Sequence, residues 1–496
     1  MFGLDYQTLL KRDIIERLDS VDYPISIEEL KEQLGYSNSV TILKMLKELS
    51  QLVTDVYANS EYSIELITVK RGVFQLKRQG SNLQDIFHAI FTRDFAYKLL
   101  SSLIEKRTLS SIEICNEWGL SQSTLQRRVR LINKKIKAYS VYVSCAEKIQ
   151  FKSNELNIRI FSYVFLWSTN RQISKVSWIE NKSKYLDLSK SVMSYLGMLF
   201  DPFKIEILAF WVFIYSNAIL KKKELSLNYE QISILKDFSI PKRPIEFNSW
   251  SGIEWEMFVL TLYNSDIYDF DLSIVEMPHS SVLKSINGYS STFLDCFVMQ
   301  FSSLNSKKQK EFNLLFTKSA LSSYFSEYSI DYTGNTAHVV NFAEFSKDYP
   351  NYWTRFKRAW ACFIDKKRES KHLITYESVA LSLCLSIFPL NKFSLHPLEL
   401  QMFISSDISI SYERYLEEMI KEKFQNKYKI KFTKNFLEAQ IVVTTIANEQ
   451  TSLPINQQLV IISPRMKKDD YLLLEKSLSS VTKMLTDTIR CRKMGK

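Results

Sequence analysis

The chain has 496 residues, of which only 10 are glycine and 10 are proline, a composition that favours helices. No two glycines are closer than eight residues, which excludes GxGxxG and GxxxxGK phosphate-binding loops and the nucleotide enzymes that use them. The length and the 46% hydrophobic content indicate a globular protein of several domains. The net charge of +11 suggests a polyanionic partner if the basic residues are clustered.

The six cysteines are widely spaced, with no CxxC pair and no histidine at zinc-finger spacing. This pattern indicates reduced thiols in a cytosolic protein, and we expect no metal site and no cofactor. The first residues, MFGLDYQTLLKRD, include an early acid and no apolar run of signal-peptide length. The most apolar stretch, 207–215, is nine residues long, so we expect no export signal and no membrane span.

Two segments of the N-terminal region share one pattern of three helices. In each, the second helix opens with a capping box, Ser26-x-x-Glu29 in the first copy and Ser110-x-x-Glu113 in the second. A glycine that tolerates positive φ ends this helix, and one residue later a serine is expected to cap the third helix. These pairs are Gly35 with Ser37 and Gly119 with Ser121. A helix, a turn of three or four residues and a helix form the helix-turn-helix arrangement.

Alternating residues follow each copy and predict a short hairpin. In the first copy the strands are expected at 62–69 and 73–77, and in the second at 140–143 and 148–151. The sequence therefore predicts two winged helix-turn-helix domains.

The third helix of the second copy has one apolar face and one cationic face. An apolar stripe contains Leu125, Val129, Ile132 and Ile136, and between residues 121 and 137 there are six basic residues and no acidic one. Serine and glutamine side chains at the start of such a helix can reach base edges, and arginines can contact guanine or phosphate. We predict a major-groove reader, and the alternative is a merely solvated face. The predicted DNA-binding residues are Gln122, Ser123, Gln126, Arg127, Arg128, Arg130 and Lys134.

The first copy carries a weaker signal for DNA binding. Its third helix turns Lys44 and Lys47 outward, but residues 1–50 contain nine acids and six bases. A DNA contact through these two lysines and a purely structural or dimer-contact role both remain open.

From about residue 155 the pattern changes to long helices separated by polar linkers. They are expected at 156–167, 204–220, 253–263, 291–304, 307–325, 352–364 and 376–387. These helices fit two bundles divided near 271–280, and the aromatic stretch 205–220 is expected to be bundle core.

The last hundred residues alternate between strands and helices, which predicts a small parallel-sheet α/β domain. The expected strands are 400–405, 427–432, 441–445 and 459–463, with helices at 411–424 and 469–485. The fold class is therefore mainly α and multidomain. No GxSxG or HExxH motif occurs and the five histidines are dispersed, so we do not expect an enzyme.

The order of these parts resembles the Mga-type global transcriptional regulators of Gram-positive bacteria, a group that includes the AtxA-like virulence regulators. The segments that carry the resemblance are NEWGLSQSTLQRRVRLINKKI and NELNIRIFSYVFLW. The resemblance implies two winged helix-turn-helix domains, two helical regulation domains and an EIIB-like α/β domain. The corresponding ranges are 1–80, 81–155, 156–278, 279–396 and 397–496.

Regulation domains of this kind are phosphorylated on histidine by the sugar phosphotransferase system, which implies phosphocarrier proteins as partners. Residues 155–278 contain no histidine, so the candidates are His338, His372 and, at the domain edge, His279. The EIIB phosphocarrier has a cysteine after its first strand, whereas the corresponding loop here reads SSDISISYERY. An interaction or dimerisation role for this domain is therefore expected.

Together these features predict a cytosolic regulator that binds double-stranded DNA as a homodimer or higher oligomer, away from membranes. Activation and repression of transcription both remain open. The alternatives are an RNA-binding antiterminator with phosphotransferase regulation domains and a component of the phosphotransferase system itself.

Overall fold

The computed structural model describes residues 1–35, 38–58, 63–79, 82–265, 267–301, 303–326, 345–346, 349–367, 377–390, 399–425, 427–445 and 457–494. The chain divides into two compact units. The first comprises 1–291, 313–339 and 368–382, and the second comprises 292–312, 340–367 and 383–496.

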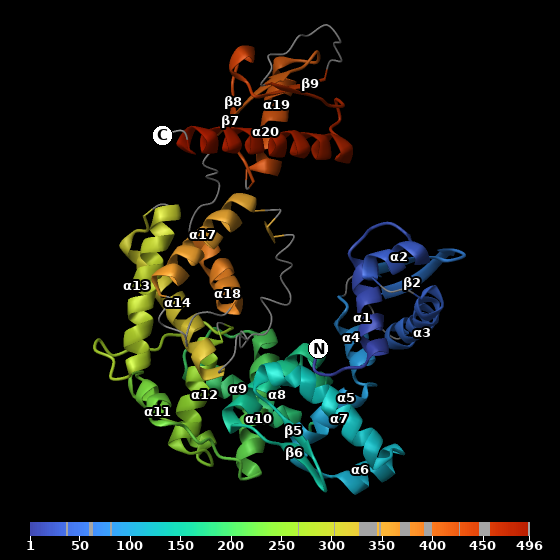
Figure 1. Cartoon of the computed structure of the whole chain (residues 1–496), viewed down its shortest axis with the longest axis vertical. Coiled ribbons are helices and arrows are strands. Elements are labelled where there is room, and N and C mark those ends of the chain that lie inside the picture. Colours follow the sequence, from blue (N-terminus) through green and yellow to red (C-terminus); the bar gives the residue numbers. More distant parts are fainter. Residues whose placement is uncertain are drawn as a thin grey trace. The chain divides into compact units, whose positions relative to one another are not determined.

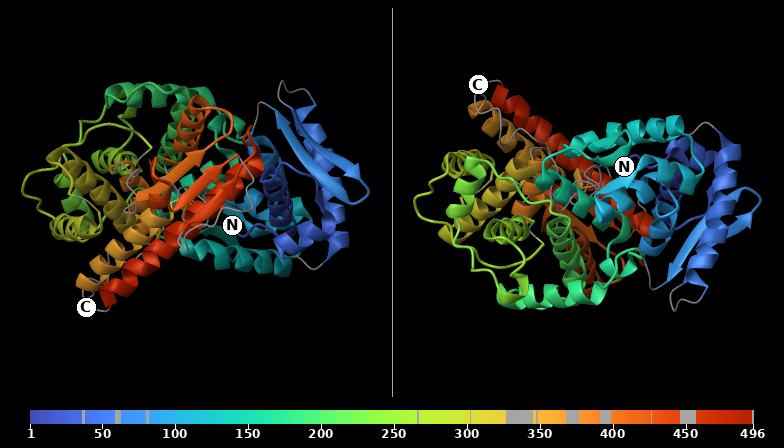
Figure 2. Two further views of the ribbon diagram at one scale, coloured as in Figure 1. Left: turned by 90° about the horizontal axis from the view of Figure 1, so that it is seen from above. Right: turned by 90° about the horizontal axis from the view of Figure 1, so that it is seen from below.

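The first winged-helix segment contains three helices and a three-stranded antiparallel sheet (Figure 1). Its elements are α1 (Tyr6–Asp19), β1 (Ile25–Ser26), α2 (Ile27–Leu34), α3 (Ser39–Tyr57), β2 (Ser63–Lys70) and β3 (Val73–Gln79). Figure 2 shows the β2–β3 hairpin, whose first strand packs against α3. Gly35 ends α2 with a φ of 66°, as expected. The cap expected at Ser37 is wrong, because the side chain of Asn38 stands directly before α3 and accepts its first amides.

The second winged-helix segment repeats this pattern. Its elements are α5 (Phe95–Lys106), β4 (Thr108–Ser110), α6 (Ser111–Trp118), α7 (Gln122–Ile136), β5 (Val143–Cys145) and β6 (Lys148–Phe151). The first wing strand was expected at 140–143 and lies at 143–145, because Ser140 has a φ of 53° and ends a 3-10 turn. The short strands β1 and β4 were not predicted, since two or three residues are too few to show an alternation.

A helical bundle follows the second winged helix in the same unit. Its helices are α8 (Glu155–Asn170), α9 (Lys182–Tyr195), α10 (Pro202–Leu220), α11 (Tyr229–Lys236) and α12 (Gly252–Asn264). The sequence predicted α8, α10 and α12, whereas it missed the more polar α9 and α11, and also α4 (Gln84–Phe91) between the two winged helices.

Helix α10 is apolar on all sides and is the centre of this bundle. Trp211 and Tyr215 are fully buried, and the ring of Trp211 stacks on Tyr163 of α8 with centroids 4.1 Å apart. Among the described residues, this is the one helix whose length and hydropathy would suit a membrane span, with a mean hydropathy of 1.5. Its contacts with α8, α9 and α12 show that it serves as bundle core, as its aromatic composition predicted.

Four further helices are α13 (Ser281–Gln300), α14 (Ser306–Ser326), α17 (Pro350–Lys366) and α18 (Glu377–Ile387). Three of them agree with the expected stretches, whereas α13 begins ten residues before the expected start at 291. The earlier start has a local cause, because the buried hydroxyl of Ser280 accepts the amide of Leu283 at 3.2 Å and caps the helix.

The C-terminal part is an α/β fold with a four-stranded parallel sheet in the order β10-β9-β7-β8. Its elements are β7 (Glu399–Ser405), α19 (Ile410–Phe424), β8 (Lys429–Phe432), β9 (Ile441–Thr444), β10 (Gln458–Ile461) and α20 (Lys468–Met494). Alternate strand residues such as Met402 and Val443 pack against Ile420 of α19 and Leu478 of α20, so both helices cover one face of the sheet. The parallel sheet agrees with the prediction.

Candidate nucleic-acid interface

The turn between α6 and α7 has the geometry that a helix-turn-helix requires. Ser110 caps α6 by accepting the amide of Glu113 at 3.3 Å, and Gly119 ends that helix with a φ of 62°. Ser121 then caps α7 by accepting the amide of Thr124 at 3.2 Å. These local signals, all read from the sequence, fix where one helix stops and the next begins.

Helix α7 presents a cationic face opposite its buried stripe. Leu125, Val129, Ile132 and Ile136 are all buried, as expected, with Leu125 and Ile136 fully inaccessible to solvent. Ser123, Arg127, Arg130 and Lys134 are exposed, as is Leu131 beside them. An exposed one-sign face on a helix of this width suits the major groove of duplex DNA.

The three remaining predicted residues of α7 lie on the flanks of this face. The guanidinium carbon of Arg128 lies 4.7 Å from the ring centroid of Phe95 on α5, so Arg128 makes a packing contact within the domain. Gln122 is exposed, and its amide group accepts the thiol hydrogen of Cys115 at 3.4 Å. Gln126 is half-buried. Arg127, Arg130 and Lys134 are therefore the most outward cations of the predicted set.

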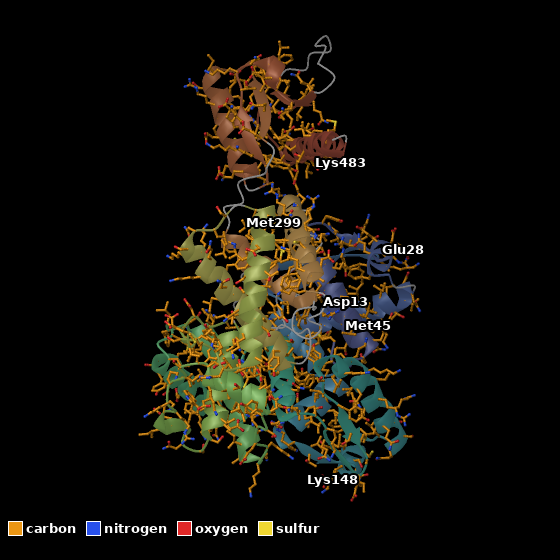
Figure 3. The ribbon with its side chains drawn as sticks, turned by 60° about the vertical axis from the view of Figure 1, so that its left-hand side comes forward. Asp13, Glu28, Met45, Lys148, Met299 and Lys483 are labelled. Carbon is orange, nitrogen blue, oxygen red and sulfur yellow. The ribbon has the colours of Figure 1, made fainter. Side chains whose placement is uncertain are left out.

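Asn133 connects α7 to the wing, a role that sequence reasoning missed. Its side-chain amide donates to the carbonyl of Val143 at 2.8 Å and accepts the amide of the same residue at 2.8 Å. The wing is therefore held to the helix by two hydrogen bonds from one side chain. Lys148, which Figure 3 labels, is an exposed cation at the start of the second wing strand and was not among the residues predicted to bind DNA.

The N-terminal residues pack against the inner side of α7. Phe2 is buried, and its ring lies 5.6 Å from Tyr139 and 5.4 Å from Phe165 between ring centroids. Gly3 has a φ of 85°, and a Cβ at this position would lie 2.6 Å from the Cα of Ile132. The backbone at residue 3 thus touches the backbone of α7, an approach that only glycine allows.

The corresponding surface of the first copy is less cationic. Lys44 and Lys47 are exposed on α3, as the sequence predicted, and Val40 beside them is 73% exposed. Lys44 lies 3.9 Å from the carboxylate of Glu48, which also pairs with Lys11 at 2.7 Å. Glu48 partly neutralises the positive charge of this face, so α7 is better suited than α3 to bind a polyanion.

The second winged helix is joined to the bundle by polar contacts at the end of α5. Asn217 of α10 donates to the carbonyls of Ile104 and Glu105 at 2.9 and 3.1 Å. Arg107, which ends α5 with a φ of 67°, donates to Glu155 of α8 at 2.8 Å. Two of the last carbonyls of the helix are therefore satisfied by a side chain of the neighbouring bundle.

Of the three candidate histidines, the structure describes one. His279 is exposed, and its backbone amide donates to the buried carboxylate of Asp237 at 2.6 Å. His338 and His372 lie outside the described residues. In the C-terminal domain, Asp407 in the loop after β7 accepts the hydroxyl of Thr445 at 2.8 Å.

Among the described residues, no group of three or more His, Cys, Asp or Glu side chains is arranged to hold a metal ion. The turn before α7 and the exposed cations of that helix are typical of helix-turn-helix proteins that bind DNA.

Comparison with known proteins agrees with this class. Residues 79–166 match the Mga helix-turn-helix domain, a segment that begins before α4 and ends within α8. This region is therefore similar to the Mga helix-turn-helix domain, and the match indicates a DNA-binding transcriptional regulator. No curated protein matches the chain.

Proposed function

We propose that the chain is a cytoplasmic transcriptional regulator of the Mga type that binds duplex DNA through α7 and the β5–β6 wing. The observation that carries the proposal is the exposed set Arg127, Arg130 and Lys134, directly opposite the buried stripe of the same helix. With Ser123 at the start of this face, the helix can combine phosphate contacts with contacts to base edges.

The test is a fluorescence-anisotropy titration of duplex DNA from upstream of the protein's own gene neighbourhood, repeated over a series of salt concentrations. The logarithm of affinity is expected to fall with the logarithm of salt, with a slope of about 0.9 per phosphate contacted. The double variant Arg127→Ala, Arg130→Ala should bind more weakly and lower this slope by about 1 for each lost phosphate contact.

A matched control removes the same charge elsewhere in the first unit. Lys236 and Lys242 are exposed on and after α11, so the variant Lys236→Ala, Lys242→Ala should retain the affinity and slope of the unchanged chain. Equal losses in the two double variants would show that net charge alone drives binding. An unchanged slope after the α7 substitutions would refute the assignment of that helix.

We infer that the helical part receives a signal, either phosphorylation by phosphotransferase phosphocarrier proteins or assembly into a homodimer or higher oligomer. A phosphoryl group adds charge and strong acceptors, which can reorganise helix contacts. His279 supports the first route because its side chain is exposed while Asp237 holds its backbone. His338 and His372 are the other candidates.

Incubation with the phosphocarrier proteins, followed by acid-labile phosphate analysis of the chain and of His279→Ala, tests this route. Transfer of phosphate onward to a sugar would favour a phosphotransferase component, which the thiol-free loop of residues 406–409 argues against. Preference for RNA hairpins over duplex DNA in direct competition would favour the antiterminator alternative. Light scattering at several concentrations tests oligomerisation.

A further inference from the structure

Two cysteines of the second unit place their sulfur atoms side by side. The Sγ atoms of Cys296 in α13 and Cys362 in α17 are 2.8 Å apart, although 66 residues separate them in the sequence. Both thiols are free. A disulfide requires about 2.05 Å between sulfurs, so the two atoms lie less than about 1 Å beyond bonding distance.

Aromatic packing holds the two helices together around this pair. The ring of Phe293, one turn before Cys296, lies 5.4 Å from the rings of both Trp360 and Phe363, between centroids. Because these rings flank the cysteines on both helices, α13 and α17 cannot separate without breaking edge and tilted ring contacts. The approach of the two thiols is therefore imposed by the core and not by flexible side chains alone.

The two thiols differ in their access to solvent. Cys296 is fully buried, whereas Cys362 is partly exposed. Burial, together with the neighbouring Cys362, raises the pKa of the Cys296 thiol to about 11, and Lys366 opposes the shift. Cys296 therefore remains a protonated thiol near neutral pH, and Cys362 is the sulfur that an oxidant in solution reaches first.

We propose that Cys296 and Cys362 form an oxidation site for hydroperoxides, of which hydrogen peroxide is the simplest, and that its product is an intramolecular disulfide. With hydrogen peroxide, the Cys362 sulfur attacks one peroxide oxygen and the O–O bond breaks. The other oxygen leaves as water with the thiol proton of Cys362, and Cys362 becomes a sulfenic acid. The Cys296 sulfur then attacks the Cys362 sulfur, and the sulfenic oxygen departs as a second water with the Cys296 proton. Two thiols lose two electrons and two protons, and one peroxide becomes two waters.

This site is separate from DNA recognition and does not depend on it. A covalent link between α13 and α17 would close a long loop of the chain and restrict its unfolded state. It would thereby give the second unit a response to peroxide that involves no residue of α7.

The experiment treats the full chain with hydrogen peroxide at neutral pH, blocks the remaining thiols by alkylation and maps peptides without reductant. We expect one cross-linked peptide pair that joins Cys296 to Cys362, and a loss of two titratable thiols. The link should be absent from Cys362→Ser and present in Cys384→Ser. Cys384 is the matched control, because it is another buried cysteine of the same unit whose pKa is raised by burial to about 12.

Thermal unfolding of the oxidised and the reduced chain gives a second test, which needs no variant for its main comparison. The oxidised chain should unfold several degrees above the reduced chain, and this difference should vanish in Cys296→Ser. Sulfinic acid on Cys362 without a cross-link would overturn the proposal. An equal rate of cross-linking in urea would also overturn it, because the folded geometry would then contribute nothing.

Discussion

Arg159 and Glu254 form an ion pair from which solvent is excluded, with side chains that are 0% and 2% exposed. Both guanidinium nitrogens of the fork donate to the carboxylate, one of them at 3.0 Å. Glu155 accepts the Nε of Arg159 at 3.1 Å and also pairs with Arg107 at the end of α5. The buried charges therefore form one network that joins the second winged helix to α8 and α12.

Removal of Glu254 should destabilise the first unit strongly. The variant Glu254→Ala leaves Arg159 buried without its main counter-charge, and such losses cost about 3–5 kcal/mol of unfolding free energy. Urea denaturation followed by tryptophan fluorescence measures the change. Glu224→Ala is the control, because Glu224 is exposed in the same unit and should change stability by less than about 0.5 kcal/mol. Similar effects of the two variants would contradict a structural role for the network.

Substitution of Gly3 should displace α7, because Gly3 packs against the buried side of this helix. A side chain at φ 85° is strained, and its Cβ would meet the backbone of Ile132 at 2.6 Å, so Gly3→Ala should cost more than about 1–2 kcal/mol. We expect lower DNA affinity and a lower thermal midpoint. Gly252→Ala is the control, since nothing lies within 4 Å of the added Cβ there. Unchanged affinity in Gly3→Ala would mean that α7 does not depend on this contact.

Acid should destabilise the contact of α4 with α8 through His88. Burial lowers the pKa of His88, with Lys175 acting in the same direction and the backbone of Thr169 opposing it. The folded chain thus binds the proton more weakly than the unfolded chain does. Its contribution to stability is present above the unfolded pKa, about 6.5, and is lost as the pH falls below that value.

Denaturation at pH 7.5 and pH 5.5 measures this effect as a difference in unfolding free energy. The variant His88→Gln should lose less stability on acidification than the unchanged chain does. The control is His279→Gln, which removes an exposed imidazole and is measured at the same two pH values. A steeper loss in His88→Gln would give the opposite sign and exclude this role of His88.

We expect substitution of Arg128 to affect stability and substitution of the adjacent Arg127 to affect DNA binding. Arg128→Ala removes the contact with the Phe95 ring, so it should lower stability by about 0.5–1 kcal/mol and leave the salt slope of DNA binding unchanged. Arg127→Ala should show the reverse pattern, because Arg127 is exposed. Paired denaturation and anisotropy titrations measure both. A reduced slope for Arg128→Ala would place this arginine in the interface.

Asn133→Ala should release the wing from α7. Both hydrogen bonds to Val143 are lost, so amides of β5 and β6 should exchange with deuterium faster while those of α6 do not. If the wing contributes to binding, DNA affinity should fall with no change in net charge. Unaltered exchange in β5 would show that strand pairing alone holds the wing.

Local physics explains why the helix-turn-helix could be predicted from the sequence. A serine cap, a glycine at positive φ and a 3.6-residue apolar period are properties of neighbouring residues, so Ser121, Gly119 and the Leu125 stripe could be recognised directly. The same reasoning predicted the strands around Met402 and Val443, whose alternate residues face one helical layer.

Contacts between distant residues were decided only by the tertiary structure. Arg159 and Glu254 are 95 residues apart, and the two cysteines of α13 and α17 are 66 apart, so neither pair leaves a pattern in the sequence. Gly3 is not part of a recognisable sequence motif either. A glycine is needed there because its backbone packs against the backbone of Ile132, which is distant in the sequence. Composition, caps and periodicity determined the apolar helices and the face of α7 that carries exposed cations, whereas α4, α9 and α11 emerged only from the tertiary structure. Tertiary packing decided which buried charges, thiols and backbone segments contact one another. The physical reason is that charges interact strongly only where the folded chain excludes water.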